Sequence, residues 1–490
     1  MKRNIVKDTG FNLENTYVDT LPEIFYSNQY PAIVSESNLV IFNEELAKSL
    51  GLNIDILKSE EGKEVFSGKA LIKNSNPIAQ AYAGHQFGHF TMLGDGRAVL
   101  LGEHTVNDKR YDVQLKGSGL TPYSRGGDGK ASLGPMIREY IISESMNSLN
   151  IRTSRSLAVI KTGEEIFRIR REKGAILTRI ASSHIRVGTF EFAARLTSYE
   201  ELKALADYTI ERHYKEGKTK ENPYLYLLER VVDNGAKLVA KWMSVGFIHG
   251  VMNTDNITIS GETIDYGPCA FMDEYNKNTV FSSIDTHGRY AYINQPNMMG
   301  WDLARFAESI IPLLSEDKEK AINIAQEAIT NYTNLYRKYY IDEMRKKLGL
   351  VTEEKDDEKL IYELLDIMEV YKADYTNTFI ALTLDKKENE AIFYGKEFKL
   401  WKEKWEKRVE SQGLDKNEIQ NLMKKCNPYT IPRNYKVEEA IKKAVEEDDY
   451  TYIHKLIEAM ENTYEYNEKY IDYTKVEKDH SQNYRTYCGT

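Results

Sequence analysis

The chain has 490 residues, 66 of them Lys or Arg and 75 Asp or Glu, so its formal net charge is −9. This acidic balance argues against a nucleic-acid partner. The 41% hydrophobic content indicates a globular protein with one large core or two lobes. The sequence has no apolar run long enough to span a bilayer and no signal-peptide pattern, which predicts a cytoplasmic protein without a membrane partner. Its cysteines, Cys269, Cys426 and Cys488, are too scattered for a disulfide framework or a zinc knuckle.

The first 80 residues carry little recognisable chemistry, although apolar spacing indicates a short helix near residues 43 to 51. Glycine becomes frequent after Ala81. His85 and His89 stand four apart, the spacing of two imidazoles on one helix face, so a zinc site has to be considered. Neighbouring glycines weaken a helix and no third ligand stands nearby, so a structural turn is the favoured interpretation.

A second glycine-rich stretch follows, with Gly94, Gly96 and Arg97 close together. Glycines let backbone amides approach a phosphate, and an arginine beside them can bridge phosphate oxygens in a bidentate manner. A plain hairpin turn would explain the glycines equally well. The pattern therefore leaves a phosphate site and a turn as alternatives.

A strand, a loop and a helix come next. After a predicted hairpin turn at 107–110, the residues from Tyr111 to Lys116 alternate like a strand, and a loop rich in Gly, Ser, Arg and Asp runs over 117–134. A helix is predicted from Pro135, with Glu139 in its first turns. Glu139 could stabilise the helix dipole, or it could pair with Lys116 as the lysine and glutamate of kinases do.

Residues 157–180 are predicted to form a strand, a charged turn and a second strand. Arg179 lies inside the apolar run of the second strand, and Arg186 follows shortly after it. An arginine inside a strand needs an anionic partner. Phosphate and a structural carboxylate are both open as that partner.

The strongest helical pattern covers 225–242, and polar residues that could bind metal follow it. Two β-branched runs, 257–259 and 263–264, are predicted to form a small hairpin, which Asp255 and Asn256 enter and Asp265 leaves. A tight hairpin would bring these oxygen-bearing side chains together as ligands of Mg²⁺ or Mn²⁺. The alternative is that they cap a turn and serve no metal.

The same region resembles a kinase catalytic loop with one difference. In such loops the residue after His-Gly or His-Arg is the aspartate that takes the acceptor proton, and the metal-binding asparagine comes five positions later. Here Asn256 occupies the metal position, but Val251 occupies the position of the base. Since valine accepts no proton, ordinary phosphoryl transfer to a hydroxyl is doubtful.

Beyond Pro268 a polar segment runs to about Gln295, and the remainder is mostly amphipathic helix. The predicted helices run from residue 301 through 345 and then over 356–371, 397–411 and 435–460.

Taken together, these motifs resemble the selenoprotein O family, also called YdiU. The matching stretches are Leu93 to Glu103, Asp112 to Arg138, Arg179 to Arg186, His249 to Asn256 and Asp265 to Tyr275. The resemblance implies an α+β, bilobal, protein-kinase-like fold with a β-rich N-lobe, a mostly helical C-lobe and a C-terminal helical extension. It divides the chain into an extension packed on the core over 1–80, an N-lobe over 81–195 and a C-lobe over 196–490, with an activation segment over 265–295.

The family transfers a nucleotide monophosphate to proteins, which implies transfer of AMP from ATP to Ser, Thr or Tyr hydroxyls with release of pyrophosphate. Some members are also linked to UMP transfer with Mn²⁺. The implied partners are protein substrates and the nucleotide, and we expect a monomer. A catalytically silent nucleotide-binding scaffold and a kinase that transfers the γ phosphate are the alternatives.

The resemblance also implies site residues by position. Asp255 matches the proposed base, Lys116 and Glu139 the lysine pair, and Asn256 and Asp265 the metal ligands. ATP, held in a flipped orientation, would be bound by Gly94, Gly96, Arg97, Lys116, Asp128, Gly129, Arg179, Arg186 and Asp265. The family further suggests a disulfide switch between the tail and the activation segment, for which Cys488 and Cys269 are the candidates here and ordinary thiols the alternative.

Overall fold

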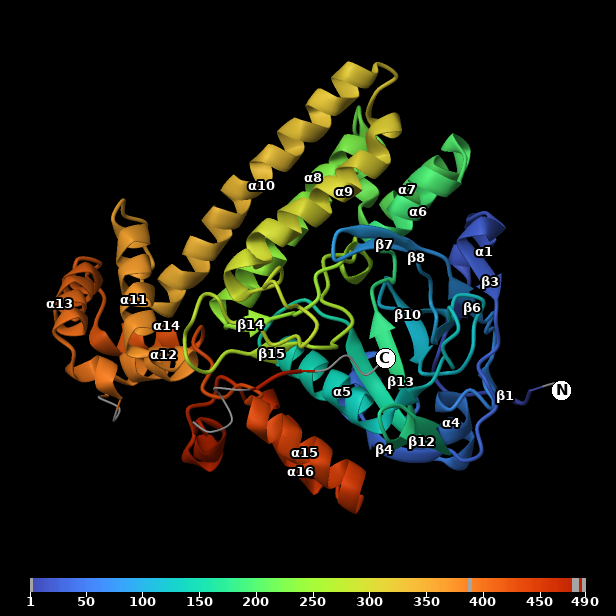
Figure 1. Ribbon diagram of the computed structural model, residues 1–490, viewed down its shortest axis with the longest axis horizontal. Helices are drawn as coiled ribbons and strands as arrows, with labels where there is room; N and C mark the ends of the chain where they lie inside the picture. The colour runs from blue at the N-terminus through green and yellow to red at the C-terminus, as the bar shows by residue number, and fades with distance from the viewer. Residues whose placement is uncertain (1–2, 387–389, 478–483, 487–490) are drawn as a thin grey trace.

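The computed structural model describes residues 3–386, 390–477 and 484–486. An antiparallel β-sheet occupies the N-terminal region and helices make up the C-terminal half (Figure 1). The predicted α+β class is thereby confirmed. Within the described part of the chain, no helix is both long and apolar enough to cross a membrane. Cys488 of the predicted disulfide switch lies outside the described residues.

Among the residues described, the main sheet has nine strands. Its continuous path runs β3-β6-β9-β10-β13-β12-β4, with β2 pairing on β9 and β11 on β13. A hairpin turn at Asn107 and Asp108, both in the left-handed region, joins β9 to β10, as predicted. The strands of this sheet are β2 (Leu13–Glu14), β3 (Tyr26–Asn28), β4 (Asn38–Phe42), β6 (Ile78–Gln80), β9 (Ala98–Val106), β10 (Lys109–Lys116), β11 (Ala131–Ser132), β12 (Arg155–Phe167) and β13 (Arg171–Ala181).

Strand register places the predicted lysine and arginine side by side. Gln114 of β10 pairs directly with Arg179 of β13, and Lys116 lies two residues further along β10. Because side chains two residues apart point to the same face of a sheet, Gln114, Lys116 and Arg179 share one face. Helix α5 (Leu133–Ser148) carries Glu139 and packs against β12 and β13.

The first 80 residues contribute strands β2, β3, β4 and β6 to the main sheet. Besides β2, β3, β4 and β6, they contain strands β1 (Ile5–Val6) and β5 (Leu71–Ile72), which pair with each other. Their helices α1 (Thr16–Thr20), α2 (Glu44–Ser49), α3 (Ile54–Lys58) and α4 (Glu60–Phe66) precede the glycine-rich region, α2 being the helix predicted near 43 to 51. Residues from α2 to α4 join a hydrophobic cluster with Val113 and Leu115 of β10. The predicted domain limits at 80 and 195 stay a prediction.

The C-terminal half is built on three long helices, α8, α9 and α10, which pack together and extend away from the sheet (Figure 1). The strong apolar pattern at 225–242 is α8, as predicted. The helices of this half are α6 (Val187–Leu196), α7 (Tyr199–His213), α8 (Pro223–Ser244), α9 (Gln295–Leu314), α10 (Lys318–Lys347), α11 (Asp357–Tyr371), α12 (Tyr375–Leu384), α13 (Lys396–Glu410), α14 (Lys416–Lys424), α15 (Asn434–Glu447) and α16 (Thr451–Glu461).

Several predicted elements differ from the structure. The predicted helix at 435–460 is two helices, because the chain turns at Asp448, whose backbone is left-handed. The helices α12 and α14 were not predicted. The runs 257–259 and 263–264 form a single antiparallel bridge between Ile257 and Thr263 instead of two strands. Thr258 also bridges to Arg186 and Thr263 to Thr153, so the expected hairpin is reduced to one local bridge and the other pairing is with distant segments.

Short elements complete the fold near the site. The strands β7 (Ala83–Gln86) and β8 (His89–Met92) form a separate two-stranded sheet, and β14 (Phe247–Ile248) pairs with β15 (Ala270–Phe271). A single 3₁₀ turn, η3 (Thr254–Asn256), carries Asp255 and Asn256. The segment between Asp265 and Gln295 has little regular structure apart from β15 and the 3₁₀ turn η4 (Tyr292–Asn294).

Candidate functional site

A cavity of about 680 Å³ gathers most of the residues that the sequence singled out. The sheet, the loop 123–130, η3 and the residues following Ile264 all contribute to its wall. Of the predicted site residues, those lining it are Gly94, Gly96, Arg97, Lys116, Asp128, Gly129, Arg179, Arg186, Asp255, Asn256 and Asp265. Glu139 lies behind this wall and contacts two of its cations.

The buried Lys116 forms the ion pair that its position in the sequence suggested. Its Nζ lies 2.7 Å from Oε2 of Glu139 and 2.8 Å from Oδ1 of Asp265. Arg179 donates from Nε to the other oxygen of Glu139 at 3.0 Å. Burial lowers the pKa of Lys116, and Arg179 and Arg97 lower it further, because each disfavours another positive charge nearby.

Asp265 is the carboxylate on which the cations converge. Besides Lys116, Arg179 approaches it at 2.6 Å and Arg186 at 3.4 Å. Although burial opposes ionisation, the charges of Arg179, Lys116 and Arg186 hold the pKa of Asp265 well below its usual range. Its backbone is left-handed, with φ of 59°, a conformation that is uncommon outside glycine and that aims this side chain at the cations.

The glycines of the phosphate-like motif are required by close contacts. Gly94 has φ of 113°, and a Cβ there would lie 2.4 Å from the ring of Tyr123. At Gly129 a Cβ would lie 2.2 Å from the carbonyl oxygen of Gly119. Gly94 therefore packs closely on the Tyr123 ring and Gly129 on the backbone of its own loop, and both glycines line the cavity together with Arg97.

Asp128 stands at the rim and is held by a residue that was not predicted. Arg168, in the turn between β12 and β13, contacts both Asp128 oxygens at 2.8 and 2.9 Å. The hydrogen bonds from Arg168 lower the pKa of Asp128. This bidentate pair ties the glycine-rich loop to the tip of the β12–β13 hairpin.

Asp255 and Asn256 face the cavity from η3. Burial raises the pKa of Asp255 to about 6, and its Oδ1 atom is buried without a hydrogen-bond partner among the described residues. The amide nitrogen of Asn256 donates to the carbonyl of Val251 at 3.0 Å, so the amide oxygen is the atom of this side chain that can coordinate a metal ion or accept a hydrogen bond. Val251 also lines the cavity, so an apolar side chain occupies the place of a kinase base.

These oxygens suit a hard divalent cation only with help from a substrate. Within the described residues, no three His, Cys, Asp or Glu side chains are grouped closely enough to hold a metal by themselves. Mg²⁺ in nucleotide sites is bound by one or two protein ligands together with phosphate oxygens and water. The amide oxygen of Asn256 and the carboxylate of Asp265, which line the same cavity, are protein ligands of the kind and number that such a site uses.

Several lining residues were missed by the sequence analysis. The Arg186 guanidinium stacks over the ring of Tyr82 at 4.4 Å, and Asp95 accepts from Gln114 at 3.3 Å. Asp95 stands between Gly94 and Gly96, so its place in the motif was a usable signal. Tyr82 and Arg168 carried none, because their contacts come from tertiary packing.

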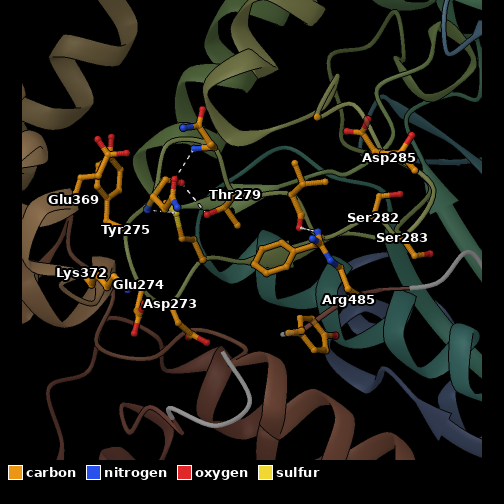
Figure 2. A pocket seen from close by; sticks show the side chains of 18 residues that line it. Asp273, Glu274, Tyr275, Thr279, Ser282, Ser283, Asp285, Glu369, Lys372 and Arg485 are labelled. Carbon is orange, nitrogen blue, oxygen red and sulfur yellow. Dashed lines mark hydrogen bonds between the residues drawn. The ribbon is translucent and has the colours of Figure 1, made fainter. Parts of the chain in front are cut away.

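A second and larger cavity, of about 940 Å³, lacks this convergence (Figure 2). It lies among residues 272–288, the end of α11 and residues 484–485. Two of its acidic groups already have partners: Glu369 pairs with Lys277 at 2.9 Å, and Asp285 accepts the backbone amides of Arg289 and Tyr290. Figure 2 shows its charged side chains spread around the rim. We therefore place the chemistry in the smaller cavity.

Comparison with known proteins agrees with these motifs. The family model described as protein adenylyltransferase SelO matches residues 11–461. The protein nucleotidyltransferase YdiU of Clostridium perfringens (strain SM101 / Type A) is 58% identical over 489 residues, covering 100% of this chain and 99% of the relative. That of Clostridium botulinum (strain 657 / Type Ba4) is 56% identical over 490 residues, with both chains fully covered. The chain belongs to the SelO family of protein adenylyltransferases, as its motifs predicted.

Proposed function

We propose that this enzyme transfers AMP from ATP to Ser, Thr or Tyr hydroxyls of proteins and releases pyrophosphate. The observation that carries the proposal is the convergence of Lys116, Arg179 and Arg186 on Asp265 in one cavity, which Asp255 also lines. Within this group the kinase position of the base is held by Val251. Such a site favours the binding of a polyphosphate over proton removal at the usual kinase position.

The cations are suited to hold the leaving pyrophosphate. Seven Arg or Lys side chains and four Asp side chains line the cavity, so its wall carries a surplus of positive charge even when the buried Glu139 behind Lys116 is counted. When the β and γ phosphates enter, the cations can exchange the Asp265 oxygens for phosphate oxygens. Fixed cations stabilise the charge that develops as pyrophosphate departs.

Asp255 is the residue that would accept the proton. The acceptor hydroxyl oxygen attacks the α phosphorus, its proton passes to the Asp255 carboxylate, and the bond from the α phosphorus to the bridging oxygen breaks. The electron pair of that bond leaves with pyrophosphate. Because burial raises its pKa to about 6, Asp255 is a better proton acceptor near neutral pH than an ordinary aspartate.

Asn256 and Asp265 would hold a divalent cation, Mg²⁺ or Mn²⁺. When bound, the cation supplies charge neutralisation for the phosphates. Asn256 presents its amide oxygen because its nitrogen is held by Val251. Asp265 becomes available once the phosphates draw its cations away.

The proposed architecture is bilobal and kinase-like. The antiparallel sheet with Lys116 and the helix with Glu139 correspond to an N-lobe, and the helical half corresponds to a C-lobe. In kinases a lysine–glutamate ion pair of this kind orients the lysine toward the phosphates. The Lys116–Glu139 contact of 2.7 Å supports the same role here.

The test uses ATP labelled on either the α or the γ phosphate, with Mg²⁺ or Mn²⁺ and a mixture of proteins as acceptors. We expect α label on protein and its loss in Asp265→Ala and in the isosteric Asp265→Asn. Arg171→Ala, which removes an exposed arginine outside the cavity, is the matched control and should keep full transfer. Transfer of γ label would identify a kinase, and nucleotide binding without transfer would identify a scaffold; either result would refute the proposal. Labelled UTP with Mn²⁺ tests for UMP transfer.

A further inference from the structure

The motif at 83–90, Ala-Gly-His-Gln-Phe-Gly-His-Phe, has no place in the proposed chemistry, yet it lies against the turn that carries Asp255. It forms the β7–β8 hairpin, whose tip has Phe87 with φ of 51° followed by Gly88. The two histidines do not share a helix face. His85 is buried on β7, whereas His89 is exposed on β8, so the structural-turn interpretation is confirmed and the zinc alternative is wrong.

The hairpin contacts η3 along its length. The backbone amide of His85 donates to the Thr254 hydroxyl at 2.7 Å, and the amide of Phe87 donates to Oδ1 of Asn253 at 3.1 Å. The contact at Gly84 is so close that a Cβ there would lie 2.9 Å from Oδ1 of Asp255. The hairpin backbone therefore holds the two residues that precede Asp255 and packs against the Asp255 carboxylate itself.

A buried carboxylate from a different element completes this network. Glu191 of α6 accepts hydrogen bonds from the Thr254 hydroxyl and from the ring of His85, each with a separate oxygen. Its side chain is 3% exposed, and Thr254 is fully buried. Three chain segments thus meet at the Thr254 hydroxyl, which receives one hydrogen bond and donates another.

We propose that Thr254, Glu191 and His85 are positioning residues, which hold the η3 turn so that Asp255 and Asn256 face the nucleotide. This inference rests on the proposed roles of Asp255 and Asn256. None of the three side chains lines the cavity, so they act through the turn and touch no reacting atom. Residues that orient metal ligands from behind typically contribute 10- to 100-fold to metal affinity or activity.

Thr254→Val is the decisive variant, because it keeps the volume of the side chain and removes only the hydroxyl. We expect kcat for α-phosphate transfer to fall by roughly 100-fold, since small displacements of reacting groups have effects of that size. KM for ATP should change little, because Lys116, Arg179 and Arg186 are untouched. Thr254→Ser restores the hydroxyl and should recover most of the lost rate, and Glu191→Gln should give an intermediate loss.

A binding measurement separates this inference from the proposed function. Calorimetry with a non-hydrolysable ATP analogue, with and without Mn²⁺, reports how much the metal increases affinity. We expect Thr254→Val to reduce this metal-dependent gain at least about tenfold while affinity for the analogue alone stays at the wild-type value. This result does not depend on whether the α or the γ phosphate is transferred.

Thr209→Val is the matched control for stability. Thr209 is equally buried, in α7, where its hydroxyl donates to the Leu205 carbonyl at 2.7 Å, and it does not line the cavity. Both variants should lower Tm by a similar amount, but only Thr254→Val should lower kcat and the metal-dependent gain. If Thr254→Val lowers Tm but leaves kcat and the metal-dependent gain in affinity unchanged, the network only stabilises the fold and the positioning role is wrong.

Discussion

Two buried ionic clusters of this enzyme use the same residue types in opposite ways. Around Asp265, the cations Lys116, Arg179 and Arg186 meet carboxylates beside an open cavity, and the Asp265 side chain is 23% exposed. The carboxylates of this cluster are Glu139, Asp265 and Asp95, the last of them 3.9 Å from Arg186. Around Arg433, one cation faces two carboxylates: it contacts Asp273 at 2.7 Å and Asp374 at 2.6 Å, and its own side chain is 1% exposed.

The sign of the surplus charge distinguishes the two clusters. The cavity beside the Asp265 cluster is lined by seven Arg or Lys and four Asp side chains, and this excess of positive charge suits it to receive an anion. The Arg433 cluster has one negative charge in excess; burial and the neighbouring Asp374 raise the pKa of Asp273, which offsets that charge by favouring protonation. It joins α15 to the segment after β15 and to the start of α12, so we interpret it as a structural connection.

The largest expected effect comes from Arg179→Met, which removes one cation of the Asp265 cluster and keeps much of the side-chain volume. We expect AMP transfer to fall by roughly 10²- to 10³-fold, the usual cost of losing one preorganised group that stabilises charge. Initial rates at saturating ATP measure it. Transfer within a few-fold of wild type would show that Arg179 serves the fold alone.

Arg433→Met should disrupt the Arg433 cluster and lower the free energy of unfolding, with no direct effect on the nucleotide site. Removing the cation leaves two buried carboxylates uncompensated, which costs about 3–5 kcal/mol. Urea unfolding measures the loss. The affinity of the folded fraction for an ATP analogue should remain at the wild-type value, and a selective loss of that affinity would contradict the structural interpretation.

A buried acid outside both clusters gives a pH-dependent effect. Asp302 in α9 is fully buried, and neither of its oxygens has a hydrogen-bond partner among the described residues. Burial, with help from Glu191, raises its pKa well above the usual value. The folded protein therefore binds a proton that the unfolded chain releases above about pH 4, so stability decreases as pH rises through that window.

Asp302→Asn removes this proton uptake and should stabilise the protein increasingly from pH 5 to pH 8. The gain should grow by up to about 1.4 kcal/mol for each pH unit until the folded pKa is passed. Urea unfolding at several pH values measures the difference. An advantage that is constant with pH would show that Asp302 stays ionised in the fold.

The smallest effect on nucleotide binding is expected from Arg168 and Asp128, which line the nucleotide cavity outside the Asp265 cluster. Arg168 and Asp128 are 19% and 42% exposed, so their ion pair contributes about 1 kcal/mol or less to stability. Arg168→Ala should leave Tm nearly unchanged and weaken ATP affinity several-fold by freeing the glycine-rich loop. Calorimetry tests this, and an unchanged affinity would exclude Asp128 from nucleotide binding.

Sequence patterns were sufficient to predict ion pairs between residues of neighbouring strands and helices. An ion pair between Lys116 at the end of a strand and Glu139 on the next helix could be proposed in advance from the resemblance to kinases, beside a helix-dipole role for Glu139, and the structure shows the pair. The arginine inside β13 could be assigned an anionic partner, and the structure supplies carboxylates from Glu139 and Asp265.

Contacts between distant segments were beyond prediction. No periodicity indicates that Arg433 would meet Asp273 and Asp374, or that Glu191 would bridge His85 and Thr254, because these residues belong to separate elements. The convergence of three cations on Asp265 depends on a left-handed backbone at a residue other than glycine, which composition does not reveal.

The two edge strands of the main sheet limit how far this protein can be shortened from its N-terminus. Strand β3 closes one margin and β4 the other, and both come from the first 42 residues. Edge strands shield the hydrogen-bonding groups of their neighbours, and bared margins are templates for aggregation. A truncated protein that begins at the glycine-rich motif would therefore lack both edge strands. Recombinant versions of the catalytic region need the N-terminal segment to stay soluble.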